Sequence, residues 1–443
     1  MDQFQTIGAD IVKVAAHWRW VAPDVESSTR PNVDLSDPAN YNWSVLDHAV
    51  KGIEQRGMTP WLMITAPAPD WASSRSNSVK QPGVWQPDPK AFGVFAEAIA
   101  KRYPEVRYWS LMNEPNFDIW LAPQVGARGV SLSAIHYRKM YVEGRSGLDR
   151  GGAGADQIMF GELAPRAFDQ VKGAQATQPV RFLRDFFCLD SRLKPLKGSA
   201  AKARACTGRY EKSRATGFAH HPYTVAGGPS VKPQAADDAP IGSLSRIYRV
   251  LDKAYAYKRL SQRKIPLWDT EFGYQSNPPD IFWTPIRRVA QYLNASEQMS
   301  YRDPRVRSYA QYQLQDEPLG SGSTLKYSGF QSGLFFADGT AKAGPLDGYR
   351  LPLVVNRTRS ANKVSVWGAV RKPSSSARQV LLQVRNGSGT FSTVKSINLR
   401  AGARYFSSGY SASKAAKKTY RTVVGELLGY PTGVTRRVDP RRN

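Results

Sequence analysis

The sequence predicts an α/β fold: a (β/α)8 TIM barrel that lacks its first strand, followed by a small C-terminal β-sandwich. Strand-like and helix-like segments alternate through the first 345 residues, and this alternation indicates parallel strands joined by helical crossovers. After Pro345 the pattern changes to short alternating strands separated by turn residues. A doubly wound open sheet is the alternative, but no glycine-rich nucleotide loop follows any expected strand.

The expected barrel strands are short apolar runs, and the expected helices repeat apolar residues at three- and four-residue spacing. The strands are expected at residues 9–16, 58–66, 106–112, 157–163, 218–223, 265–272 and 308–315. The helices are expected at residues 42–56, 88–103, 132–148, 180–189, 241–260 and 286–299. These strands are one short of a closed barrel. We therefore expect the chain to begin inside the first helix, with the first strand and any export signal lost.

The C-terminal part has the pattern of a small sandwich. Its strands are expected at residues 364–367, 380–384 and 391–397, with turn signals between them. We divide the chain into a barrel over residues 1–350, a β-sandwich accessory domain over 361–435 and a loose basic tail over 436–443. Residues 346–359 are expected to hold the last barrel helix and a linker.

The composition limits the classes of partner. The chain has 443 residues with a net charge of +26, and a hydrophobic fraction of 41% excludes wholesale disorder. Residues 351–443 hold 18 Lys or Arg and two acidic residues, which favours an acidic glycan or a cell surface, or simply a solvated basic face. Nucleic acid is disfavoured because this charge lies on no helix or known reading motif. No apolar run is long enough for a membrane span, and we expect a monomer.

The two cysteines, Cys188 and Cys206, lie 18 residues apart across a Gly-, Ala- and Lys-rich connection. This spacing suits a disulfide that closes a surface loop, with two unrelated free thiols as the alternative. A disulfide indicates an oxidising compartment, so an extracellular or cell-surface location is expected. The first residues after Met1 do not have the pattern of a leader peptide.

Two glutamates lie at the C-terminal ends of strands, which is where barrel enzymes carry their catalytic residues. Glu114 follows the strand at 106–112, and Glu271 lies at the end of the strand at 265–272, on what would be strands 4 and 7. These strands face each other across the barrel mouth, so both carboxylates can reach one cleft. A carboxyl pair that flanks a glycosidic bond is the minimal equipment for its hydrolysis. Each glutamate alone could equally be a helix cap or a salt-bridge partner.

The sequence Asn113-Glu114-Pro115, with Glu271 after an apolar strand 7, resembles glycoside hydrolase clan A. This clan contains retaining (β/α)8 glycosidases and includes families 5 and 39. The resemblance spans about four-fifths of the chain. It implies that Glu114 is the acid/base, that Glu271 is the nucleophile, and that Asn113 hydrogen-bonds the sugar 2-hydroxyl.

Further residues extend the resemblance or depart from it. His221-Pro222-Tyr223 is similar to the His-x-Tyr of strand 6 in family 5, where the tyrosine hydroxyl holds the nucleophile ionised. Lys13 stands where the clan usually has an arginine, and lysine keeps the charge without the planar fork. The tryptophan that usually follows strand 8 is not evident.

Aromatic residues follow several strands and are candidates for sugar platforms, because the C–H faces of sugars stack on such rings. His17, Trp18 and Trp20 follow strand 2, Trp71 follows strand 3, and Trp120 follows strand 4. The alternative is that some of them pack loops onto the barrel.

Together these observations predict a retaining O-glycosyl hydrolase that cleaves an oligo- or polysaccharide by double displacement. The rival interpretation is a non-catalytic polysaccharide- or cell-wall-binding protein on a degenerate glycosidase barrel. No metal motif is present and the chemistry needs no cofactor, so none is expected. The sugar, its linkage and the choice between endo and exo action do not follow from the sequence.

Overall fold

The structure is a computed structural model that describes residues 2–74, 82–167, 176–224, 227–321, 326–427 and 430–441. The last two residues of the expected basic tail, Arg442 and Asn443, lie outside this part. None of the helices in the described ranges is long and apolar enough to cross a membrane.

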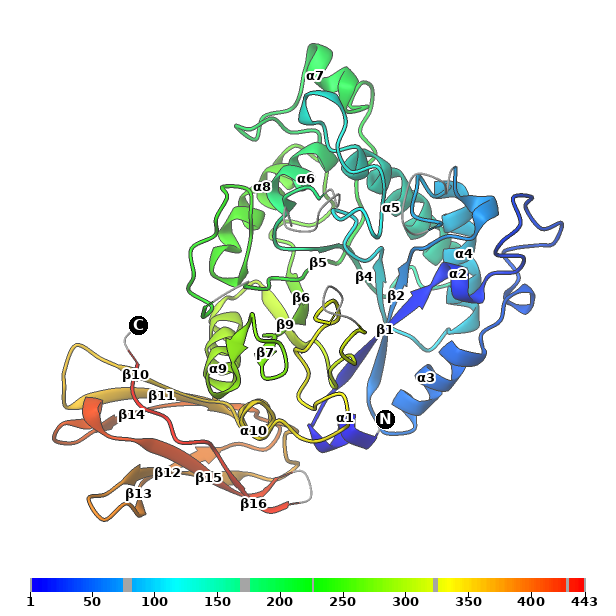
Figure 1. Ribbon diagram of the computed structural model, residues 1–443. Helices are drawn as coiled ribbons and strands as arrows, with labels where there is room; N and C mark the ends of the chain where they lie inside the picture. The colour runs from blue at the N-terminus through cyan, green and yellow to red at the C-terminus, as the bar shows by residue number, and fades with distance from the viewer. Residues whose placement is uncertain are drawn as a thin grey trace.

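The N-terminal part is a curved sheet of seven strands, all parallel, which neighbour one another in chain order (Figure 1). They are β1 (Ile11–His17), β2 (Thr59–Thr65), β3 (Tyr108–Leu111), β4 (Gln157–Leu163), β5 (Gly217–His220), β6 (Leu267–Phe272) and β9 (Val306–Gln311). Within the described residues β1 and β9 are the two edges and do not pair with each other. The expectation of a barrel that is one strand short is therefore confirmed.

Helices cover the outer face of this sheet (Figure 1). The longer ones are α3 (Ser44–Glu54), α4 (Pro89–Arg102), α5 (Leu132–Arg150), α6 (Pro179–Phe186), α8 (Ser245–Ala256), α9 (Ile286–Arg302) and α10 (Ala343–Arg350). Shorter elements are α1 (Asp2–Thr6), α2 (Trp18–Val21), α7 (Gly198–Ala203), β7 (Ser276–Asn277) and β8 (Thr284–Pro285).

Helix α4 shows how local sequence fixes these elements. The Asp88 side chain caps its first turn by accepting hydrogen bonds from the backbone amides of Lys90 and Ala91, and proline occupies the first helical position. Its apolar face, which includes Phe92 and Phe95, is fully buried. Close packing against α5 requires glycine, because a Cβ on Gly147 would lie 1.9 Å from the carbonyl oxygen of Gly93.

The C-terminal part is the expected β-sandwich, made of two antiparallel sheets (Figure 1). One sheet contains β10 (Leu353–Arg357), β11 (Lys363–Ala369) and β14 (Tyr405–Ser411). The other contains β13 (Phe391–Leu399), β12 (Arg378–Arg385), β15 (Tyr420–Leu427) and β16 (Tyr430–Val434). Alternate residues of β12, namely Val380, Leu382 and Val384, enter the core between the sheets.

Two boundary expectations need correction. Residues 353–357 form strand β10 of the sandwich, so the stretch expected as a linker is largely structured. The tail expected to be loose is docked over its described residues: Val438 pairs with Tyr420, and Arg441 pairs with Asn356. The Arg441 guanidinium donates to Asn356 Oδ1 at 3.0 Å and to Gln298 Oε1 at 3.1 Å, a hydrogen-bonding role that composition alone does not reveal.

The sandwich contacts α9 of the barrel through a buried ion pair. The Arg371 guanidinium lies 2.7 Å from the Glu297 carboxylate, and the two side chains are 4% and 2% exposed. Arg371 also donates to the Tyr349 carbonyl at 2.9 Å, and the Tyr405 hydroxyl donates to Glu297. These contacts join the two parts of the chain.

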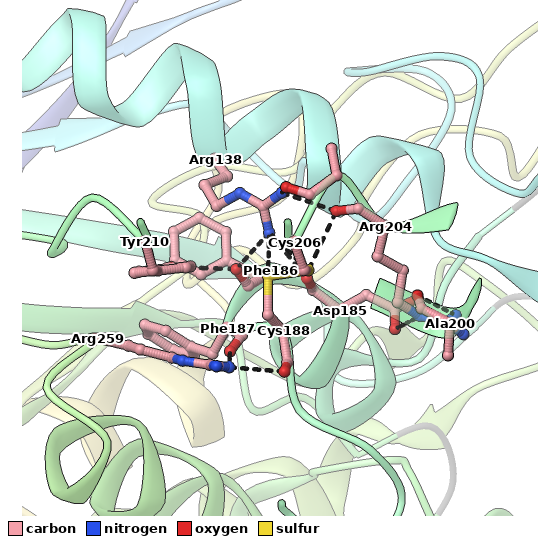
Figure 2. The surroundings of a disulfide bond; sticks show 11 residues. Arg138, Asp185, Phe186, Phe187, Cys188, Ala200, Arg204, Cys206, Tyr210 and Arg259 are labelled. Atoms are coloured by element: carbon pink, nitrogen blue, oxygen red, sulfur yellow. Dashed lines mark hydrogen bonds and ion pairs between the residues drawn. A yellow bond between two sulfur atoms is a disulfide. The ribbon is translucent and has the colours of Figure 1, made fainter. Parts of the chain in front are cut away.

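The predicted disulfide between Cys188 and Cys206 is present, with a Cα–Cα distance of 5.8 Å. Figure 2 shows Arg138 of α5 reaching over this bond. Its guanidinium donates to the carbonyl oxygens of Asp185 and Phe186 on one side and of Arg204 and Ala205 on the other. The bond and the arginine thus fasten both ends of the loop to the barrel.

Candidate active site

The ends of β3 and β4 have unusual backbone geometry that aims two glutamates at the barrel mouth. Glu114 has φ +34° and Glu162 has φ +48°, and both values lie in a backbone region that residues other than glycine rarely adopt. A register shift between Gly161 and Leu163 places Glu162 in a bulge of β4. Tyr137 of α5 supports both strands, since its hydroxyl donates to the Leu111 carbonyl and accepts from the Gly161 amide.

The two predicted catalytic glutamates come together around His221. One carboxylate oxygen each from Glu114 and Glu271 and the Nδ1 atom of His221 all lie within 4.8 Å of one another. His221 Nδ1 is 2.8 Å from Glu114 Oε1 and 3.5 Å from Glu271 Oε2. The carboxylates remain accessible, with side chains 17% and 11% exposed.

Two further groups hold Glu271. Lys13 Nζ donates to Glu271 Oε1 at 2.8 Å, and the Tyr223 hydroxyl donates to Glu271 Oε2 at 3.2 Å. Lys13 thus provides a charge at the position where an arginine was expected, and Tyr223 lies where the His-x-Tyr resemblance placed it. Both oxygens of Glu271 thus accept a hydrogen bond, which fixes the orientation of its carboxyl group.

Glu162 is a site residue that the sequence analysis missed. Its side chain is fully buried, yet it accepts from His221 Nε2 at 2.7 Å and from Lys13 Nζ at 3.3 Å. The hydroxyls of Ser110 and Thr270 also donate to it. The available signal was an acidic residue inside the apolar run of β4, since a buried carboxylate needs partners of this kind.

The charges of this cluster shift its pKa values strongly. Burial alone would lower the pKa of His221, but the Glu271 charge and the hydrogen bonds to Glu114 and Glu162 raise it to about 10. Burial would raise the pKa of Glu162, but the Lys13 charge and the His221 hydrogen bond hold it well below its usual range. Despite burial, the carboxylates beside Lys13 raise the pKa of that amine. Lys13, Glu162 and His221 are therefore charged at neutral pH.

The set Glu114, His221 and Glu271 is compact enough to be considered as a metal site. The donor set does not fit one, because both ring nitrogens of His221 face carboxylates and Lys13 already neutralises Glu271. A metal ligand would need a neutral imidazole with a free nitrogen.

A cavity of about 510 Å³ opens beside this cluster, between the edges β1 and β9. Lys13, His17, Asn113, Trp120 and Glu271 are among its lining residues. The Oδ1 atom of Asn113 is buried and has no hydrogen-bond partner among the described residues. This oxygen is therefore available to a hydroxyl donor from a ligand.

The expected aromatic platforms divide into two groups. His17 Nδ1 donates a hydrogen bond to the Ala66 carbonyl at 3.0 Å, and the His17 ring lies 3.9 and 5.8 Å from the ring centroids of Trp20 and Trp120. Trp20, which the sequence analysis also named among the aromatic candidates, is 69% exposed. These three rings form one aromatic group near the cavity.

Trp18 is not part of that group, which corrects its expected place at the mouth; Trp71 is half-buried, and its contact with substrate stays a prediction. Trp18 is 1% exposed and stacks on Phe95 in the barrel core. Trp71 lies edge-on to Trp18, and its Nε1 donates to the Pro23 carbonyl. Helix α2 begins directly after His17, and this turn directs the Trp18 side chain into the core. The position of Trp18 after a strand does not reveal this turn.

No family model and no curated protein matches this sequence. Several solved structures, in contrast, are similar to this chain. A glucosidase from Croceicoccus marinus is similar over 93% of this chain and 88% of that chain, with 12% identity and a TM-score of 0.50. A family 39 glycoside hydrolase from Bacteroides cellulosilyticus WH2 is similar over 93% of this chain and 77% of that chain, with 13% identity and a TM-score of 0.51.

This chain has the fold of those glycosidases. At such low identity the likeness concerns the fold of both the barrel and the sandwich, since 93% of this chain is covered. The resemblance to clan A that the motifs carry thus agrees with an independent comparison of structures. The chemistry has to be argued from the site itself.

Proposed function

We propose that this protein is a retaining glycoside hydrolase in which Glu271 is the nucleophile and Glu114 the acid/base. The observation that carries the proposal is the approach of the two carboxylates to within 4.8 Å around His221. Retaining enzymes keep their carboxyl groups about 5–5.5 Å apart, whereas inverting enzymes need about 6.5–9.5 Å for a water molecule. The likeness of fold to solved glycosidases supports glycosidase activity in general.

The reaction would proceed in two displacements. Glu271 attacks the anomeric carbon while a proton from Glu114 goes to the leaving oxygen, which leaves a glycosyl ester on Glu271. Glu114 then takes a proton from water, and the resulting hydroxide equivalent cleaves the ester. Lys13 and Tyr223 hold both oxygens of Glu271, so that the nucleophile is oriented before the substrate binds.

We assign the binding of the sugar to the cavity beside these groups. The free Oδ1 of Asn113 would accept a hydrogen bond from a sugar hydroxyl. The rings of His17, Trp20 and Trp120 offer faces for C–H stacking. We propose an oligo- or polysaccharide substrate, with the basic sandwich as the part that meets an acidic glycan or a cell surface. The disulfide is consistent with an extracellular location.

The test is a screen of the purified chain against a panel of polysaccharides and aryl glycosides, with analysis of released sugars. We expect release of reducing ends, and we expect Glu271→Gln to abolish it while substrate binding persists. Glu211→Gln, which removes a carboxylate from an exposed loop, is the matched control and should keep activity. Salt-sensitive binding of polysaccharide with no released sugar would instead favour a non-catalytic binding protein.

A further inference from the structure

Glu162, the buried partner of His221, has no role in the two displacements of the proposed reaction. Both ring nitrogens of His221 face carboxylate oxygens, Nδ1 that of Glu114 and Nε2 that of Glu162, at 2.8 and 2.7 Å. The ionised carboxylate of Glu162 only accepts hydrogen bonds, so Nε2 must carry a hydrogen. The 2.8 Å contact between Nδ1 and Glu114 then holds a second proton between the imidazole and this carboxyl group.

Glu162 itself cannot reach a sugar. Its side chain is 0% exposed, and it accepts hydrogen bonds from His221, Lys13, Ser110 and Thr270. A buried carboxylate is costly in free energy unless it is paired with cations and hydrogen-bond donors. The purpose that its contacts suggest is to hold a cation next to Glu114.

We propose that His221 supplies the proton that Glu114 passes to the leaving group, and that Glu162 is the positioning residue that keeps His221 protonated. This inference rests on the proposed glycosidase function. It adds a proton store to the acid/base, because the Glu114 carboxyl group lies 2.8 Å from Nδ1 of His221.

The proton balance closes over one turnover. In the first displacement the Nδ1 proton moves to Glu114 and from there to the leaving oxygen. His221 becomes neutral, and its Nε2–H stays hydrogen-bonded to Glu162. In the second displacement Glu114 takes a proton from water and returns it to Nδ1. No outside acid is consumed, and Glu162 stays ionised throughout.

Other charges around His221 are compatible with this cycle. The Glu271 charge is the largest influence that raises the His221 pKa, and it disappears when Glu271 carries the sugar. The loss of that charge lowers the proton affinity of His221 as the leaving group departs. The remaining titratable groups that influence or adjoin the imidazole are Lys13, Glu114, Glu162, His220, Tyr223 and Asp269.

Nuclear magnetic resonance of ¹⁵N-labelled histidine tests the proton store without any substrate. The chain has five histidines, so the His221 signal can be assigned with His221→Asn. We expect both ring nitrogens of His221 to remain protonated up to at least pH 9. In Glu162→Gln we expect its pKa to fall by about 1–3 units, because an opposite charge at hydrogen-bond distance is lost.

Matched controls separate this effect from a general change of charge. Glu211→Gln removes the same charge from an exposed loop and should leave the His221 titration unchanged. The His220 signal is an internal reference, since burial lowers the pKa of His220 to about 4. If Glu162→Gln does not fold, Glu162→Asp keeps the charge but shortens its reach, and the expected fall is smaller. A His221 that is neutral at pH 7, or that does not respond to either variant, would overturn the proposal.

A leaving-group series tests the catalytic part. Aryl glycosides with very good leaving groups need little acid assistance, so Glu162→Gln should change their kcat/KM by less than about twofold. Poor leaving groups should lose about 10²-fold, as expected for impaired general acid catalysis. An equal loss for all leaving groups would overturn the proton role. Absence of any glycosidase activity would refute the proposed function while leaving the histidine titration as a separate result.

Discussion

The ion pair between Arg371 and Glu297 gives the sharpest stability prediction, because it joins the sandwich to the barrel in a buried place. The two side chains are 4% and 2% exposed and their charged atoms are 2.7 Å apart. Substitution of Arg371 by Met would leave the Glu297 carboxylate buried without its cation. Breaking a buried pair in this way costs about 3–5 kcal/mol of unfolding free energy. Loss of the hydrogen bond to Tyr349 acts in the same direction.

Urea denaturation, followed by fluorescence, measures this loss for Arg371→Met. The control is Arg404→Met, which breaks the partly exposed pair with Asp10, whose side chains are 20% and 51% exposed. An exposed pair contributes only about 0–1 kcal/mol. The double variant Arg371→Met with Glu297→Leu should recover most of the stability, because no unpaired charge remains. Equal, small losses in the two single variants would refute the reasoning.

The remaining predictions concern the loop and the aromatic residues. Replacing both Cys188 and Cys206 by Ser should lower the free energy of unfolding by about 3 kcal/mol, and reductant should affect wild type but not the variant in the same urea experiment. Trp18→Ala should cost about 3–5 kcal/mol of stability, because it empties a core position. Trp120→Ala should instead raise KM by about 2- to 10-fold with little change in thermal midpoint, and the opposite pattern in these two variants would contradict their assignment to core and cavity.

The sequence predicted the barrel well because its elements carry strong periodic signals. The parallel strands are apolar runs, and helices such as α4 have a cap and one apolar face. The open edge between β1 and β9 followed from counting these elements. Strand β10 was missed because its short apolar run directly follows the last barrel helix and resembles a linker.

At the site, the sequence placed the residues that end strands but not the one that lies in a bulge. Glu114, Glu271, His221 and Tyr223 each follow an apolar run, so topology brings them together. Glu162 needed the register shift in β4 to reach His221, and no local pattern announces such a shift. The place of Trp18 depends on where helix α2 turns, which is likewise a tertiary property.

The most direct test of the central claim is to trap the covalent intermediate. The chain is incubated with a 2-fluoro glycoside of the sugar found in the screen, carrying a good leaving group, and the labelled peptide is identified by mass spectrometry. We predict one glycosyl group per chain, attached to Glu271, and no labelling in Glu271→Gln. A label on Glu114 or Glu162, or hydrolysis that inverts the anomeric configuration, would contradict the assignment of nucleophile and acid/base.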